Sequence, residues 1–83
     1  MDLRLTPAFL KAYGNLTADE QGQVDQALKR LLEDPRYPSL QARKWDGDTW
    51  YARASRDLRF FYEVGEGYYL VRNVGHHDIE RTR

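Results

Sequence analysis

The sequence contains no cysteine, which excludes disulfides and thiolate metal sites and fits a reducing compartment. It has no apolar run near the ~20 residues that a membrane-spanning helix needs. Its first residues also lack the basic segment and apolar core of a signal peptide. These absences predict a cytoplasmic protein without a membrane partner. A chain of 83 residues is enough for one domain, which we expect to span residues 1–83.

An excess of charge is missing too, because 13 Lys and Arg residues balance 13 Asp and Glu residues. A neutral chain argues against strong non-specific binding to nucleic acid, which usually needs a basic surface. The basic residues are unevenly distributed, however, and after position 34 all of them except Lys44 are arginines. The planar fork of arginine suits bidentate contact with phosphate, although a general abundance of arginine would explain the same count.

A short strand at residues 3–5 and a short helix are indicated at the start of the chain. Thr6 and Pro7 are typical of an N-cap and a first helical residue. Gly14 is typical of the position where a helix ends. The pattern predicts a helix between these residues.

A second, longer helix follows. Thr17 and Glu20 form the capping-box pattern at its start, and it should end at Asp34, before Pro35. The apolar residues recur at helical spacing: Val24, Ala27, Leu28, Leu31 and Leu32. We interpret this stripe as core packing, which gives a helical hairpin with one apolar face.

After the loop "DPRYPSL" the apolar period changes from helical to two. Turn-forming residues separate the resulting strand candidates. The candidates are residues 41–45, 49–55, 58–64 and 68–74. Two helices followed by a meander predict an α+β fold, with the N-terminal helical hairpin packed on a twisted antiparallel β-sheet.

The candidate "LRFFYEV" carries an arginine between apolar residues. Leu58, Phe60, Tyr62 and Val64 share one face of this strand and look like the core side, whereas Arg59 points to the other face. An arginine placed there on a central strand is not needed for packing. We therefore expect Arg59 to lie on an open, concave face of the sheet.

The ordered set of segments resembles the RelE/ParE superfamily of toxins from toxin–antitoxin pairs. "TPAFLKAYGNL" is similar to the family's first helix, and "VDQALKRLLEDPRYPSL" to its second helix and proline loop. "ARKWDGDTWYARASRDLRFFYEV" is similar to its strand–turn–strand region, and "LVRNVGHHDI" resembles its last strand and tail. The resemblance covers nearly the whole chain and implies the same two-helix, twisted-sheet fold.

The resemblance implies two different activities. RelE-like members are metal-independent endoribonucleases that cleave mRNA on the ribosome (mRNA interferases) and so inhibit translation, whereas ParE-like members bind DNA gyrase without catalysis. Both kinds are neutralised by a cognate antitoxin, so the expected partners are an antitoxin with either the ribosome and mRNA or gyrase. A degenerate domain that only binds its antitoxin is a third possibility. We favour the nuclease, which needs no cofactor.

Metal-free RNA cleavage needs a base, a cation on the attacked phosphate and an acid. The resemblance implies that Arg59 contacts the phosphate, that His77 transfers a proton and that Arg53 supports Arg59. The sequence does not decide on which face of the sheet Arg53 lies. A two-residue turn would pair it with Phe60, and a three-residue turn would pair it with Phe61.

Further cations are candidate RNA contacts, although each alone is more simply a solvated charge: Arg43, Lys44, Arg56 and Arg81. Two features depart from the RelE pattern. The chain is neutral rather than basic, and the tail "IERTR" has no tyrosine, so Arg81 and Arg83 stand where a catalytic tyrosine is common.

The tail "VGHHDIE" holds the only two histidines of the chain. Adjacent residues of an extended chain point to opposite faces, so His76 and His77 would chelate one metal ion poorly, and we predict no metal site. A solvated tail is the simpler alternative. In the catalytic interpretation, His77 transfers a proton and Asp78 orients it. Tyr51 or Glu63 is then a remote candidate for the second proton transfer.

Overall fold

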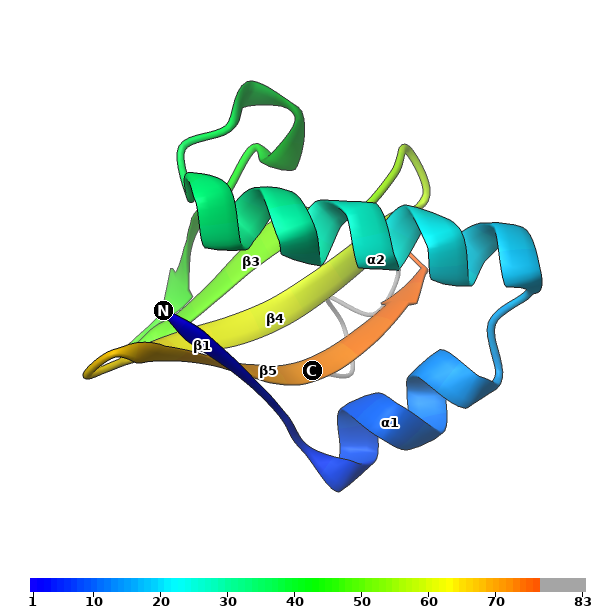
Figure 1. Ribbon diagram of the computed structural model, residues 1–83, viewed down its shortest axis with the longest axis horizontal. Helices are drawn as coiled ribbons and strands as arrows, with labels where there is room; N and C mark the ends of the chain where they lie inside the picture. Colours follow the sequence, from blue (N-terminus) through cyan, green and yellow to red (C-terminus); the bar gives the residue numbers. More distant parts are fainter. Residues whose placement is uncertain (77–83) are drawn as a thin grey trace.

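The computed structural model describes residues 1–76, which form one five-stranded sheet and two α-helices (Figure 1). The elements are β1 (Asp2–Leu5), α1 (Pro7–Gly14), α2 (Ala18–Glu33), the short 3-10 helix η1 (Pro38–Leu40), β2 (Arg43–Asp46), β3 (Thr49–Arg53), β4 (Leu58–Gly65) and β5 (Tyr68–His76). The strand order is β1-β5-β4-β3-β2. The predicted fold class is confirmed.

Both helices begin at the predicted caps. The hydroxyl of Thr6 accepts a hydrogen bond from the Phe9 N–H at 3.1 Å. The Thr17 N–H donates to the Glu20 carboxylate at 2.9 Å and the Glu20 N–H donates to the Thr17 hydroxyl at 3.2 Å, which completes the capping box. Local side-chain chemistry therefore fixes where each helix starts.

The sheet is mixed rather than wholly antiparallel. Strands β2 to β5 form the predicted antiparallel meander. The first strand, β1, joins the far edge and runs parallel to β5, with Asp2 opposite Tyr68 and Leu5 opposite Val71. Alternation within a strand shows which residues share a face but does not identify a distant partner, so the sequence did not indicate this pairing.

One face of the sheet is covered by α2, and α1 lies against β5 (Figure 1). The main core between these layers comprises Phe9, Val24, Ala27, Leu28, Leu31, Leu40, Ala52, Leu58, Phe60, Tyr62, Tyr69, Val71 and Val74. The two helices diverge from their connection (Figure 1). A hydrogen bond of 2.7 Å from the Tyr13 hydroxyl to Asp25 links α1 to α2. Among residues 1–76, no helix combines the length and the apolarity needed to cross a membrane.

The sequence predicted correctly which face of β4 points to the core, but wrongly that the other face is open. Leu58, Phe60 and Tyr62 are buried in the core as expected, whereas Val64 is 52% exposed at the end of the strand. On the opposite face Arg59 and Phe61 are also buried. Phe61 packs in a second, smaller aromatic cluster, and Arg59 folds onto the adjacent turn, so this face is not the open surface that the sequence suggested.

Candidate functional site

The candidate site lies on the face of the sheet opposite α2, which we call the arginine face and define by Arg43, Arg53 and Arg59. Strand β3 pairs with β4 so that Arg53 lies opposite Arg59 and Tyr51 opposite Phe61. Directly opposite residues share a face, so both arginines lie on this side. Neither register considered from the sequence occurs, because residues 54–57 form a longer turn, closed by the Ala54 N–H donating to the Leu58 carbonyl at 2.9 Å.

Arg59 holds this turn in place. Its Nη1 donates to the backbone carbonyls of Ser55 at 3.0 Å, Arg56 at 2.9 Å and Leu58 at 3.1 Å. The residue is only 8% exposed, and carbonyl dipoles are the partners that a buried guanidinium requires. The geometry therefore gives Arg59 a structural task, which differs from the open phosphate contact expected from the sequence.

The other predicted cations divide between the two faces. Arg43 lies opposite Tyr51 and its Cζ is 4.9 Å from the centre of the Tyr51 ring, a cation–π contact on the arginine face. Lys44 lies opposite Trp50, so its side chain projects from the face of the sheet that α2 covers. Arg56 is exposed in the turn. Of the predicted contacts, Arg43, Arg53 and Arg59 are brought together, and Lys44 is not.

An aromatic cluster lies beside these arginines and was missed from the sequence. Trp45, Tyr51 and Phe61 have ring centres 5.2 to 6.0 Å apart. Tyr51 and Phe61 are opposite each other across β3 and β4, and Trp45 joins them at a register shift in β2. The alternation of Tyr51 with Arg53 and of Phe61 with Arg59 was the available signal, but the strand register was needed to interpret it.

Next to the cluster, Arg72 binds Glu63 at 2.7 Å. The β4–β5 pairing skips Arg72, since Phe61 pairs with Asn73 and Tyr62 with Val71. A cavity of about 360 Å³ opens here and is lined by Thr49, Phe61, Arg72, Asn73 and Ala8. Glu63, one of the remote candidates for proton transfer, is therefore engaged with a cation.

The described part of the histidine tail ends at His76. Its Nε2 lies 2.9 Å from Oε2 of Glu20, at the first turn of α2. The Thr17 N–H and this histidine contact hold the pKa of the Glu20 carboxyl below its ordinary value. His77, Asp78 and Arg81 lie outside the described residues. Among residues 1–76, no three His, Asp or Glu side chains gather as a metal site would require.

No family model and no curated protein matches the sequence. Solved structures do. The YoeB/ParE toxin from Agrobacterium tumefaciens has 19% identity and a TM-score of 0.77, with 93% of this chain and 99% of that chain covered. The isolated E. coli RelE toxin has 23% identity and a TM-score of 0.71, with 90% and 82% covered. The intact E. coli RelBE toxin-antitoxin complex matches at 23% identity and a TM-score of 0.70, with 89% of this chain and 93% of that chain covered.

These matched structures are two toxins and a toxin–antitoxin complex, and the alignments extend over about nine tenths of this chain. The chain therefore has the fold of this class of protein. In particular it has the RelE/ParE toxin fold, and the resemblance seen in the sequence is confirmed at that level.

Proposed function

We propose that this protein is the toxin of a type II toxin–antitoxin pair and inhibits translation by cleaving mRNA on the ribosome, in the cytoplasm. The observation that carries the proposal is the grouping of Arg43, Arg53 and Arg59 with an aromatic cluster on one face of a RelE/ParE-type sheet. Guanidinium groups suit phosphate, and aromatic rings suit stacked bases.

In this proposal the arginine face holds the RNA backbone. Arg43 and Arg53 supply positive charge, and Arg59 keeps the turn that carries Arg56 in position. The ribose 2′-oxygen attacks the neighbouring phosphorus, the bond to the 5′-oxygen breaks, and the products are a 2′,3′-cyclic phosphate and a 5′-hydroxyl. His77 is the proposed proton-transfer group, because an imidazole titrates near neutral pH.

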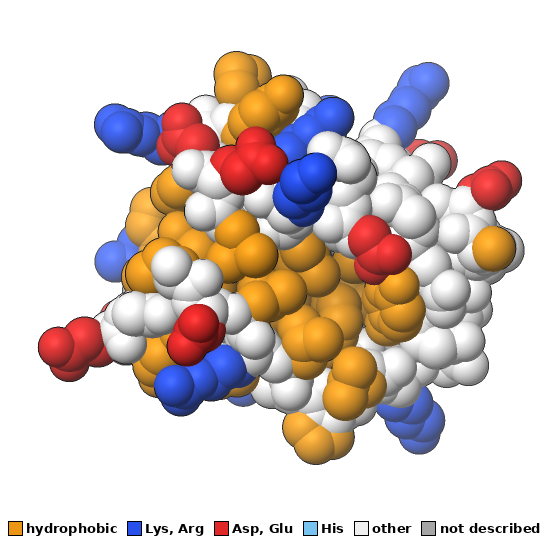
Figure 2. All heavy atoms as spheres, viewed as in Figure 1, with side chains coloured by type: hydrophobic (Ala, Val, Ile, Leu, Met, Phe, Trp, Pro, Cys, Tyr) orange, Lys and Arg blue, Asp and Glu red, His pale blue; other side chains and the backbone are white. Residues whose placement is uncertain are grey.

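The proposed antitoxin site is the groove between the two helices. It is lined by apolar residues of β1, α1 and α2, among them Leu5, Leu10 and Leu32, which are 39%, 53% and 39% exposed. Figure 2 shows hydrophobic side chains gathered between the helices, with charged side chains around them. Exposed apolar surface of this kind is typical of a protein-binding site, and two of the solved structures with the same fold are toxin–antitoxin complexes.

A ParE-like toxin that inhibits gyrase without catalysis is the second candidate. Two observations favour it. The guanidinium of Arg59 is buried and engaged by backbone carbonyls rather than presented to a ligand, and the chain is neutral, with 13 basic and 13 acidic residues. A surface that only docks on a protein needs neither an exposed cation nor a net positive charge.

The deciding experiment is controlled induction in growing cells, followed by primer extension on cellular mRNA. The nuclease proposal expects protein synthesis to stop first and cuts to appear inside translated codons. It also expects Arg53→Ala and His77→Ala to remove the cuts while the far-UV circular dichroism of the purified variants stays unchanged. An earlier stop of DNA replication, without cuts, supports the gyrase alternative. Normal growth after induction excludes toxicity altogether.

A further inference from the structure

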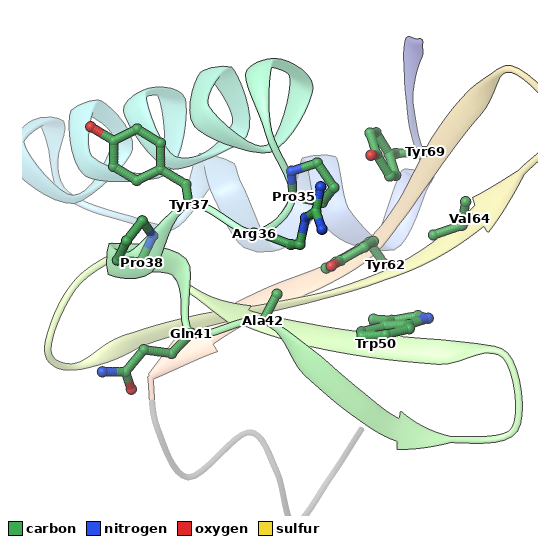
Figure 3. A pocket seen from close by; sticks show the side chains of 10 residues that line it. All are labelled: Pro35, Arg36, Tyr37, Pro38, Gln41, Ala42, Trp50, Tyr62, Val64 and Tyr69. Carbon is green, nitrogen blue, oxygen red and sulfur yellow. The ribbon is translucent and has the colours of Figure 1, made fainter.

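A further cavity, which we call the loop pocket, lies on the α2 side of the sheet, away from the arginine face. Its volume is about 410 Å³, within the range of small-molecule sites. Trp50, Tyr62 and Tyr69 form one side, and the loop after α2, with Pro35, Arg36 and Tyr37, forms the other (Figure 3).

The wall formed by the loop is well fixed. Pro35 and Pro38 restrict its backbone, and Leu40, at its far end, is completely buried in the core. Tyr37 lies under the guanidinium of Arg30, which is 5.1 Å from the ring centre and also donates to Ser39 at 3.0 Å. A pocket with a restrained wall binds a ligand at a lower cost in conformational entropy.

Two tyrosine hydroxyls in this pocket have no protein partner. Tyr62 is 2% exposed and Tyr69 is 5% exposed, and within residues 1–76 neither hydroxyl makes a hydrogen bond. No completely buried side-chain oxygen or nitrogen in that range lacks a partner. Both hydroxyl oxygens therefore keep some accessible surface, both residues line the pocket, and Figure 3 shows the hydroxyls pointing towards the loop.

These hydroxyls are hydrogen-bond donors at neutral pH. Burial, together with the neighbouring Tyr69, raises the pKa of Tyr62 to about 12. Burial, with the charge of Asp34 as a smaller cause, also raises the pKa of Tyr69. A ligand that pairs with both of these donors therefore has to offer two acceptor atoms.

The rim of the pocket carries positive charge. The side chain of Arg36 is 93% exposed, and its Nε lies 3.9 Å from Asp34. Lys44 leaves the same face of the sheet as Trp50, its direct partner across β2 and β3. Arg36 is the charged residue that lines the pocket, and Lys44 projects from the sheet beside the lining residue Trp50, which favours a ligand whose outer part is anionic.

We infer that the loop pocket binds a nucleotide. The base lies against Trp50, its carbonyl oxygens or ring nitrogens accept hydrogen bonds from Tyr62 and Tyr69, and the phosphate lies outside, near Arg36 and Lys44. The ligand is either a free nucleotide or one nucleotide of an RNA strand. This site is separate from the arginine face and does not depend on the proposed toxin activity.

The two tryptophans of the chain make the test specific, since Trp50 lies in the loop pocket and Trp45 on the arginine face. The ¹⁵N-labelled protein is titrated with AMP, GMP, CMP and UMP while the two indole N–H signals are followed by NMR. We expect the Trp50 signal to move and saturate with at least one nucleotide, with a Kd of about 1 mM or below, while the Trp45 signal stays in place.

Matched ligands and variants complete the test. Ribose 5-phosphate, which lacks the base, is expected to bind at least 10-fold more weakly. Tyr62→Phe removes one donor and is expected to weaken binding about 3- to 10-fold, the effect of one hydrogen bond. Tyr68→Phe, which removes a tyrosine hydroxyl outside the pocket, is expected to leave Kd unchanged. A short single-stranded RNA then identifies the source of the ligand, because tighter binding than the mononucleotide shows that a strand is bound.

The inference is overturned if no nucleotide moves the Trp50 signal at 10 mM, a concentration about tenfold above the expected Kd. It is also overturned if Trp45 responds instead, if ribose 5-phosphate binds as well as the nucleotide, or if Tyr62→Phe has no effect on Kd.

Discussion

Arg53 and Arg59 are direct partners across β3 and β4, so two cationic side chains project side by side from the same face of the sheet. Like charges placed directly opposite each other destabilise a sheet. The structure relieves this repulsion by turning the Arg59 guanidinium onto the carbonyls of the turn, while Arg53 stays half-buried beside it. The two arginines therefore have different tasks, and their substitution should have different effects.

Arg59→Ala is expected to lower the free energy of unfolding by about 1–3 kcal/mol, because it leaves the partly buried carbonyls of Ser55 and Arg56 without their donor. Arg53→Ala serves as the matched control and is expected to change it by no more than about 0.5 kcal/mol, as for other substitutions away from the core. Urea denaturation followed by circular dichroism measures both. Equal losses for the two variants would contradict the structural role assigned to Arg59.

Two glycines are expected to respond to alanine in opposite directions. Gly65 pairs with Tyr68, and a Cβ at position 65 would overlap the Tyr68 ring. That ring is held by Arg4, whose Cζ is 3.9 Å from the ring centre, so Gly65→Ala is expected to destabilise the protein by about 1–3 kcal/mol. Gly22 lies inside α2 with open space around it, and Gly22→Ala is expected to add about 0.5–1 kcal/mol.

Thermal denaturation of the two glycine variants tests these signs. A third measurement identifies the cause, since Tyr68→Ala removes the ring that a new methyl group would meet. In that background Gly65→Ala should lose most of its effect. Persistence of the full loss would show that the backbone conformation at Gly65, rather than the ring, requires glycine.

The hydrogen-bonded Glu20 is expected to make stability depend on pH in the acid range. Its pKa is lowered from the ordinary 4.5 by the Thr17 N–H first and by His76 second. Because the folded state then binds this proton less readily than the unfolded state, the contribution of Glu20 is complete above pH 4.5 and is lost as the pH falls through the folded pKa. Glu20→Gln should therefore flatten the fall in melting temperature below that pH.

Asp19→Asn is the control for this prediction, because it removes the same charge from the same helical turn without breaking the capping box. It should leave the slope of melting temperature against pH closer to that of the unsubstituted protein. If both variants flatten the slope equally, the effect comes from the helix dipole as a whole and not from the hydrogen bonds of Glu20.

The groove between the helices gives a prediction for partner binding. Leu10 is 53% exposed and lines this groove, so Leu10→Glu is expected to leave stability within about 0.5 kcal/mol. If the groove binds the antitoxin, the variant remains toxic but is no longer rescued by coexpression of the antitoxin. Lys11→Gln, at the next position of α1, should be rescued normally. Rescue of both variants would remove the groove from the antitoxin interface.

Local chemistry made much of the fold readable from the sequence. The caps at Thr6 and Thr17 act within one helical turn, and Pro35 limits α2 through its own backbone, so each signal is complete in a few residues. The face shared by Leu58, Phe60 and Tyr62 follows from the period of a single strand. Such features need no knowledge of distant partners.

The features that were missed depend on distant partners or on turn length. The parallel pairing of β1 with β5 joins the two ends of the described chain. The register of Arg53 depends on the residues 54–57, whose turn is closed by the guanidinium of Arg59 as well as by backbone. The loop pocket exists only because the segment after α2 returns over β3 and β4. Neither spacing nor composition contains this information.

The position of β1 also affects how the protein is made. Residues 2–5 are translated before the other four strands, yet the segment with which they pair, residues 68–71, is synthesised only after β2, β3 and β4. A growing chain can therefore form its helices and hairpins while the edge strand β1 still lacks its pairing partner. Such long-range pairing is intrinsically slow. Co-translational folding stays incomplete until that late segment emerges, so nascent chains lack the finished architecture.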